Sequence, residues 1–156
     1  MNQSTNGDAR MRGALGMPGP LPSRAVLVVD DDAPFRDALR ELFEQRGLVV
    51  RVATDAYEGA RALREMQFDA VFTDIKMPGG GFLVLEHVRE LQPQTPVILI
   101  TGSPSGEWTE QAKHEGAFAY LTKPVGKDQI VDVLRRAFER HRFAVRAGFA
   151  AGGPPR

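Results

Sequence analysis

The chain has 156 residues, enough for one domain with a substantial core, and its 42% hydrophobic and 26% charged residues are typical of a soluble globular protein. Twenty basic and twenty acidic residues cancel, which argues against a general affinity for polyanions, and the absence of cysteine excludes disulfides, thiolate metal sites and a thiol nucleophile. The longest apolar runs are too short to span a bilayer, and the N-terminus shows no signal-peptide pattern, so we expect a cytoplasmic protein.

Residues 1–23 are rich in Gly, Pro, Asn, Ser and Thr without periodicity, which predicts a disordered tail. Five short apolar runs then alternate with five segments whose apolar residues recur at helical spacing. The runs predict strands over Ala25–Val29, Leu48–Ala53, Asp69–Asp74, Val97–Thr101 and Ala117–Thr122. The last helix is predicted over Lys127–Arg142, so that residues 24–142 form the domain and residues 143–156 a C-terminal tail.

The predicted strands are short and apolar without alternation, which indicates that helices cover both faces of the sheet. Such a sheet is parallel, and its connections are right-handed. The sequence therefore predicts an α/β domain with a doubly wound, five-stranded parallel sheet, and the common strand order at this size is 2-1-3-4-5.

Reactive side chains stand at the carboxyl ends of four predicted strands. Asp30 and Asp31 follow the first strand, Asp74 ends the third, Thr101 ends the fourth, and Lys123 follows the fifth. These ends share one edge of a parallel sheet, so we expect the side chains to converge. Oxygen donors suit Mg²⁺, and a carboxylate can attack phosphorus to give an aspartyl phosphate. A metal ion, an ammonium and a hydroxyl would then stabilise the phosphoryl oxygens.

The chain resembles the receiver domain of two-component response regulators over about Ala25 to Arg142, on the motifs Val26–Asp31, Asp74 with Met77-Pro78, Thr101-Gly102 and Lys123-Pro124. The resemblance implies a CheY-like, flavodoxin-like fold and a role in phosphorelay signal transduction. Asp74 would accept a phosphoryl group from a sensor histidine kinase or a histidine phosphotransfer protein, and the phosphorylated domain would change its binding to an effector protein.

The resemblance also implies roles for individual residues. The metal ligands would be Asp30, Asp31, Asp74 and the backbone carbonyl of Lys76. Thr101 would be the switch hydroxyl and Lys123 the phosphoryl-binding cation, with Tyr120 as the aromatic switch residue and a cis Lys123–Pro124 peptide bond. Two features depart from the family pattern, because Lys76 stands where a polar uncharged residue is common and the loop Gly79–Gly81 lacks an acidic residue and looks one residue short. Both bear on the rate of dephosphorylation.

Several other residues have simpler interpretations. Asp32 is expected to cap a helix, Trp108 to lie at the surface or an interface, and the three histidines (His87, His114 and His141) to be solvated. The arginines of the last helix are expected on its exposed face, so neither nucleic acid nor a membrane is an expected partner. No output domain follows Arg142, which suggests a stand-alone receiver. We expect it to be a monomer or a weak dimer. We expect a signalling domain that assists its own phosphotransfer and dephosphorylation, rather than an enzyme.

Two alternatives remain open at this point. The pattern Asp30-x-Asp32 with Thr101 and Lys123 also resembles small phosphatases of the haloacid-dehalogenase type, although Pro34 replaces their usual Thr or Val and no later acidic pair follows. A receiver-like scaffold that binds partners without phosphorylation is the second alternative, and the intact acidic pocket argues against it.

Overall fold

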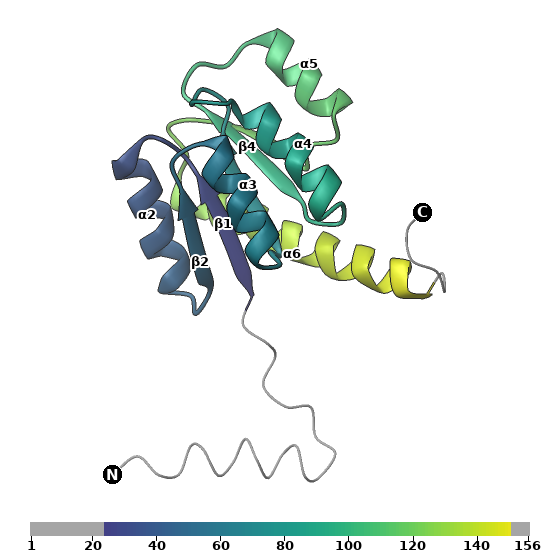
Figure 1. Cartoon of the computed structure of the whole chain (residues 1–156). Coiled ribbons are helices and arrows are strands. Elements are labelled where there is room, and N and C mark those ends of the chain that lie inside the picture. Colours follow the sequence, from purple (N-terminus) through teal and green to yellow (C-terminus); the bar gives the residue numbers. More distant parts are fainter. Residues whose placement is uncertain (1–23, 151–156) are drawn as a thin grey trace, which may run out of the picture.

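The computed structural model describes residues 24–150, the last two by backbone alone, and they form a central sheet with helices on both faces (Figure 1). The strands are β1 (Ala25–Val29), β2 (Val49–Ala53), β3 (Ala70–Asp74), β4 (Val97–Thr101) and β5 (Ala119–Thr122). The helices are α2 (Ala33–Glu44), α3 (Ala56–Glu65), α4 (Gly81–Leu91), α5 (Gly106–His114) and α6 (Lys127–Ala150). The predicted tail at residues 1–23 and the final residues 151–156 lie outside the described part.

All strand pairings are parallel, and the sheet order is β2-β1-β3-β4-β5. This confirms the predicted doubly wound topology, and the strand bounds agree with the predicted ones to within two residues. The three central strands are buried along their whole length. Burial on both faces explains why these strands read as continuous apolar runs rather than as alternating patterns.

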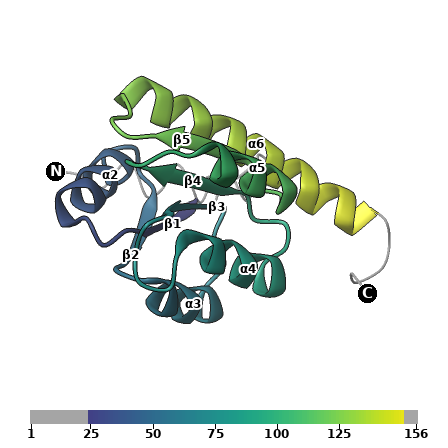
Figure 2. The ribbon, with the colours of Figure 1, turned by 90° about the horizontal axis from the view of Figure 1, so that it is seen from above.

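Helices cover both faces of the sheet (Figure 2), and a hydrophobic core lies on each face. One core packs against α3, α4 and α5, and the other against α2 and α6. Neighbouring residues of a strand point to different cores, as Val26 and Leu27 do in β1. Among the described residues, no helix combines the length and the apolar character needed to cross a bilayer.

Side chains in the loops at the carboxyl edge of the sheet cap three helices, and Ser105 caps α5 by accepting the Trp108 N–H at 3.1 Å. Asp32 caps α2 by accepting a hydrogen bond from the Phe35 N–H at 3.3 Å, as predicted. Asp55 caps α3 through the Glu58 N–H at 2.8 Å. The Glu58 carboxylate reaches back to accept the Thr54 N–H at 2.7 Å, one residue before the cap, which is a variant of the capping box.

Helix α6 is longer than predicted, because it continues from the expected end at Arg142 to Ala150. Residues 143–150 are rich in alanine and contain no proline, and the one glycine among them costs a helix only ~1 kcal/mol. A side-chain contact holds the beginning of this extension, since His141 Nδ1 lies 3.2 Å from Asp69 Oδ1. His141 is therefore not a solvated histidine, and the predicted end of the last helix at Arg142 is wrong, because the helix runs to Ala150.

Candidate functional site

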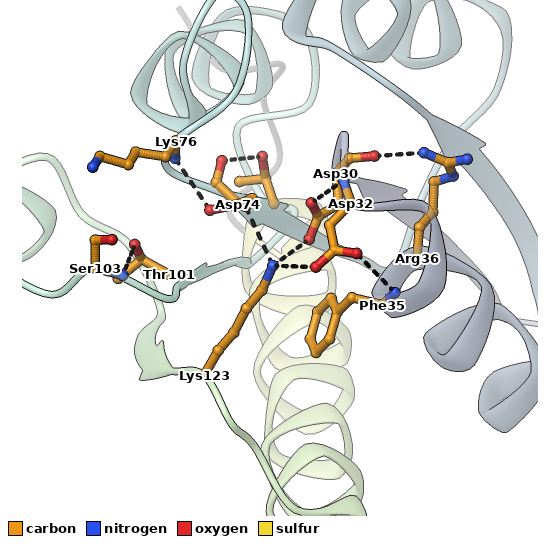
Figure 3. A network of polar contacts seen from close by, with 10 residues as sticks. Asp30, Asp32, Phe35, Arg36, Asp74, Lys76, Thr101, Ser103 and Lys123 are labelled. Carbon is orange, nitrogen blue, oxygen red and sulfur yellow. Dashed lines mark hydrogen bonds and ion pairs between the residues drawn. The ribbon is translucent and has the colours of Figure 1, made fainter.

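The register of the sheet brings the ends of the strands that carry Asp30, Asp74 and Lys123 to one edge (Figure 3). β1 pairs with β3 so that Val29 lies beside Thr73, and β3 pairs with β4 so that Asp74 lies beside Ile100. The residue after β1 and the last residue of β3 therefore stand next to each other. Their carboxylates face the loop that follows β5, from which Lys123 enters.

Three carboxylates form a compact cluster at this edge. Asp30, Asp31 and Asp74 each place one oxygen within 4.8 Å of the others. Asp30 and Asp74 are buried, with side chains 3% and 8% exposed, whereas Asp31 is exposed. The cluster is therefore open to solvent on the Asp31 side. Asp30 Oδ1 also accepts the Asp32 N–H at 2.9 Å, which fixes the loop after β1.

The Lys123 ammonium bridges these acids. Its Nζ lies 3.0 Å from Asp30 Oδ2, 3.3 Å from Asp74 Oδ2 and 3.7 Å from Asp32 Oδ2. The same atom lies 4.2 Å from the centre of the Phe35 ring. The Lys123–Pro124 peptide bond is cis. The site thus holds one ammonium among four carboxylates, which leaves an excess of negative charge.

Burial and charge crowding shift the pKa values of the site. Burial raises the pKa of Asp30, and the nearby Asp74 charge adds to the rise, although the Asp32 N–H and Lys123 oppose it. Burial by itself would lower the pKa of Lys123, but the hydrogen bond to Asp30 and the charges of Asp30 and Asp74 raise it. The ammonium is therefore held charged, and a further cation would relieve the remaining repulsion among the acids.

The two predicted switch residues lie apart from this cluster. Thr101 is fully buried, and its hydroxyl oxygen accepts the Ser103 N–H at 3.1 Å (Figure 3). Tyr120 packs against the core beneath α3, α4 and α5. Its hydroxyl is buried and has no hydrogen-bond partner within the described part of the chain. The structure thus brings together Asp30, Asp31, Asp74 and Lys123, while the side chains of Thr101 and Tyr120 make other contacts.

The backbone and the side chain of Lys76 make different contacts, on opposite sides of the residue. Its N–H donates to Asp74 Oδ1 at 3.1 Å, so the backbone holds the carboxylate. The exposed side chain points away from Asp74, and its Nζ lies 5.9 Å from the centre of the Trp108 ring in α5 (Figure 3). Trp108 is half-buried against the core, which is consistent with the surface position that the sequence suggests.

The glycine loop after β3 is shaped by close backbone approach. A Cβ at Gly81 would collide with the backbone oxygen of Asp74 and lie 2.8 Å from the Ile75 Cα. Gly79 and Gly80 have φ values of 86° and 79°, in the left-handed region that favours glycine. The three glycines therefore let α4 begin directly against the end of β3, which explains why the loop looks short in the sequence.

Two contacts at the site were not foreseen from the sequence. The Arg36 guanidinium donates from Nη1 to the backbone oxygen of Asp30 at 2.9 Å, and the Phe35 ring lies beneath the Lys123 ammonium. Both residues belong to the first turn of α2. Their spacing from Asp32 places both residues near the sheet edge.

A parallel sheet of this order, with an acid cluster and a lysine at its carboxyl edge, defines the class of phosphoacceptor signalling domains. The family model described as the response regulator receiver domain matches residues 26–135. The chain therefore belongs to the response regulator receiver family. The phosphatase alternative is not favoured by these matches.

Curated relatives and solved structures agree with this assignment. The chain is 37% identical over 121 residues to the C4-dicarboxylate transport transcriptional regulatory protein DctD of Pseudomonas aeruginosa, which covers 77% of this chain and 26% of that protein. It is 36% identical over 112 residues to a response regulator receiver protein of Anaeromyxobacter, which covers 70% of this chain and 47% of the relative. The chain thus spans about a quarter to a half of these relatives.

Among solved structures, a CheY-like response regulator receiver domain from Methanospirillum hungatei superposes with a TM-score of 0.74 at 29% identity. The match covers 78% of this chain and 98% of that one. The beryllofluoride-activated NtrC4 receiver domain dimer matches with a TM-score of 0.71 at 30% identity, over 75% of this chain and 98% of that one. These likenesses support the fold assignment for most of the described residues.

Proposed function

We propose that this domain is a phosphorylation-dependent switch in which Asp74 accepts a phosphoryl group. The observation that carries the proposal is the contact of one Asp74 oxygen with Lys123 at 3.3 Å, inside a cluster that also holds Asp30 and Asp31. A carboxylate beside a fixed ammonium can attack phosphorus, because the cation stabilises the negative charge of the transferred group. The exposed Asp31 side of the cluster provides the approach for a donor.

The phosphoryl donor is a phosphohistidine of a sensor histidine kinase or of a histidine phosphotransfer protein. An Asp74 oxygen forms the new O–P bond while the P–N bond to the imidazole breaks. The imidazole nitrogen keeps the electron pair of that bond and takes up a proton. The product is an acyl phosphate, and its later attack by water returns the carboxylate and releases phosphate. The domain supplies the position and charge for both steps, and it is otherwise a signalling module.

The residues present fit a divalent cation, and Mg²⁺ is the ion we propose. The donor atoms are oxygens of Asp30, Asp31 and Asp74, within 4.8 Å of one another, and the backbone carbonyl of Lys76 is a further donor. Hard oxygen donors with room for water are typical of Mg²⁺ sites. Burial raises the pKa of Asp30 and the charge of Asp74 raises it further, and a cation would relieve the repulsion between these two acids. A bound Mg²⁺ would neutralise charge on the transferring phosphoryl group.

Thr101 and Tyr120 are proposed to convert phosphorylation into a change of surface. The Thr101 hydroxyl now accepts the Ser103 N–H, and a phosphoryl oxygen offers it an alternative partner. The Tyr120 hydroxyl is buried without a partner in the described structure, so its present position carries a cost. A shift of Thr101 would change the packing around Tyr120 and thereby bias a two-state equilibrium of the neighbouring elements.

The surface that reports this change comprises α5, β5 and α6, and its partner is an effector protein. We further propose that residues 24–142 form the receiver domain, that it works in the cytoplasm as a monomer or weak dimer, and that neither nucleic acid nor a membrane is its direct partner. The balanced net charge supports the last point, because a nucleic-acid-binding domain is normally basic.

Acetyl phosphate with Mg²⁺ tests the acceptor assignment. Intact-mass measurement should show one added phosphoryl group on the wild-type protein and none on Asp74→Asn. Asp37→Asn is the matched control, because Asp37 is an exposed acid of α2 outside the cluster. Labelling that persists in Asp74→Asn would contradict the proposal, and absence of labelling in the wild-type protein would favour a scaffold without phosphorylation.

A further inference from the structure

The contact between Lys76 and Trp108 links the acceptor loop to α5. Lys76 lies two residues after Asp74, and its backbone N–H holds the Asp74 carboxylate at 3.1 Å. Its ammonium lies 5.9 Å from the centre of the Trp108 ring, which belongs to the first turn of α5. One residue therefore contacts both the phosphoacceptor and the helix across the sheet edge.

Helix α5 is well placed to respond to this contact. Ala112 is its only buried residue, and its apolar attachment otherwise relies on the half-buried Trp108. The loop that leads into α5 contains Ser103, which binds Thr101, and Ser105, which caps the helix. Few buried apolar contacts make an element the easiest part of a fold to shift. A change at Trp108 therefore affects the helix more than a change at one residue of α3 or α4 would.

Charge decides where the Lys76 ammonium lies. In the unphosphorylated state the Lys123 ammonium pairs with the Asp74 oxygen that faces the cluster, and the Lys76 side chain extends away from Asp74 (Figure 3). A phosphoryl group on Asp74 would add negative charge to a site that already holds four carboxylates. A cation 5.9 Å from the centre of a half-buried ring is held weakly, whereas an ammonium that reaches a phosphoryl oxygen makes a charge-assisted hydrogen bond.

We infer that Lys76 is a second phosphoryl-binding cation whose movement reports phosphorylation to α5, because its ammonium leaves Trp108 when Asp74 is phosphorylated. This inference rests on the proposed acceptor role of Asp74. It adds a route from the site to α5 that is separate from Thr101 and Tyr120, and it assigns a function to a lysine at a position where the family commonly has an uncharged residue.

Trp108 is the only tryptophan of the chain, so its fluorescence reports this contact directly. The probe is beryllofluoride with Mg²⁺, a stable mimic of the phosphoryl group on a carboxylate. The wild-type protein should show a saturable change in tryptophan emission. Lys76→Met, which keeps the length of the side chain without its charge, should lose most of that change. Lys76→Arg should retain it, because the charge is preserved.

The same variants distinguish an effect of the Lys76 charge from a general effect of substitution on the loop. Beryllofluoride affinity should fall roughly two- to fivefold in Lys76→Met, the range of an exposed ion pair, and remain near wild type in Lys76→Arg. Replacing Trp108 with Leu should raise the affinity in the Lys76 background by freeing the ammonium, and should leave it unchanged in the Lys76→Met background. The emission experiment retains the native Trp108, so it stands even if the Trp108 variant does not fold.

The outcomes distinguish this inference from the acceptor assignment. If Asp74 is labelled by acetyl phosphate but Lys76→Met matches the wild-type emission change and affinity, the inference is wrong while the proposed function stands. If the wild-type protein neither binds beryllofluoride nor accepts a phosphoryl group, both are wrong. A lost emission change in Lys76→Met, together with labelling of Asp74 in that variant, supports the inference.

Discussion

The Lys123 ammonium lies 3.0 Å from Asp30 Oδ2, although the two residues are 93 positions apart in the chain. The lysine thus contacts the acid after β1 at least as closely as the proposed acceptor Asp74, whose oxygen is 3.3 Å away. Lys123 therefore binds two of the carboxylates that would also hold a metal ion. In the absence of metal it also serves as the counter-ion of two buried carboxylates.

Replacing Lys123 with Met should have opposite effects on stability and on metal binding. Without Mg²⁺ the variant should lose about 1–3 kcal/mol of unfolding free energy, because two buried carboxylates lose their charged partner. Mg²⁺ should bind more tightly than in the wild-type protein, since no ammonium competes for the same oxygens. Thermal melts across an Mg²⁺ titration measure both effects, with Lys127→Met as an exposed control. Metal affinity equal to or below that of the wild type would contradict the competition.

Gly81 should tolerate no side chain, because its position is set by contact with the end of β3. Gly81→Ala places a Cβ against the Asp74 carbonyl and 2.8 Å from the Ile75 Cα, and overpacking of this kind costs about 1–3 kcal/mol or more. We expect lower stability and slower phosphorylation by acetyl phosphate, because Asp74 is displaced. Gly106→Ala is the matched control: it also starts a helix, and nothing lies within 4 Å of its added Cβ. Equal melting temperatures for the two variants would disprove the crowding.

The sequence predicted the sheet and the main site residues because both depend on strong local signals. Asp74 ends an apolar run that Pro78 and the glycines cannot continue, so the strand end was clear. Parallel pairing then brings this residue, Asp30 and Lys123 to one edge whatever the details of packing. The local sequence pattern determines where each strand ends, so these positions are predicted without knowledge of any long-range side-chain contact.

The remaining features depend on side-chain direction and on distant contacts, which a single sequence does not encode locally. The Lys76 side chain could extend toward Asp74 or toward Trp108 from the same backbone. The extension of α6 gains support from the contact of His141 with Asp69, which comes from a different part of the chain. Gln92 stands in a polar stretch with two prolines, a pattern that predicts a loop, although it is buried at the opposite edge of the sheet.

Gln92 should be one of the most sensitive polar residues away from the site. Its side-chain amide donates to the carbonyls of Leu63 at 2.9 Å and Met66 at 2.7 Å, and its oxygen accepts the Phe68 N–H at 2.9 Å. Gln92→Leu leaves these backbone groups without a partner, at about 1–3 kcal/mol for each buried group.

Urea denaturation should therefore show a loss of at least about 3 kcal/mol for Gln92→Leu. The exposed neighbour Gln94 provides the control, and Gln94→Leu should change stability by less than about 0.5 kcal/mol. The folded fraction of Gln92→Leu should still be labelled on Asp74, since Gln92 is at the far edge of the sheet. A loss of labelling without a loss of stability would mean that Gln92 acts on the site instead.

Asp69 should make stability depend on pH in the acidic range. It accepts the Ala25 N–H at 2.8 Å and pairs with His141 at 3.2 Å. Burial by itself would raise its pKa, but the bonds to His141 and to the Ala25 N–H lower the pKa below the ordinary 3.8. A carboxyl group with a lowered folded-state pKa contributes stability above its unfolded pKa, and that contribution is lost as the pH falls through the folded pKa.

Asp69→Asn should accordingly destabilise the protein at neutral pH by about 1–3 kcal/mol, the cost of losing a charged acceptor at a partly buried site. The difference from the wild-type protein should shrink as the pH is lowered from about 4, because the wild-type carboxyl then takes up its proton. Denaturant titrations at a series of pH values measure this difference, and Asp37→Asn should show none at any pH. A stability difference that stays constant from neutral pH to the acid limit would show that the Asp69 charge does not support the fold.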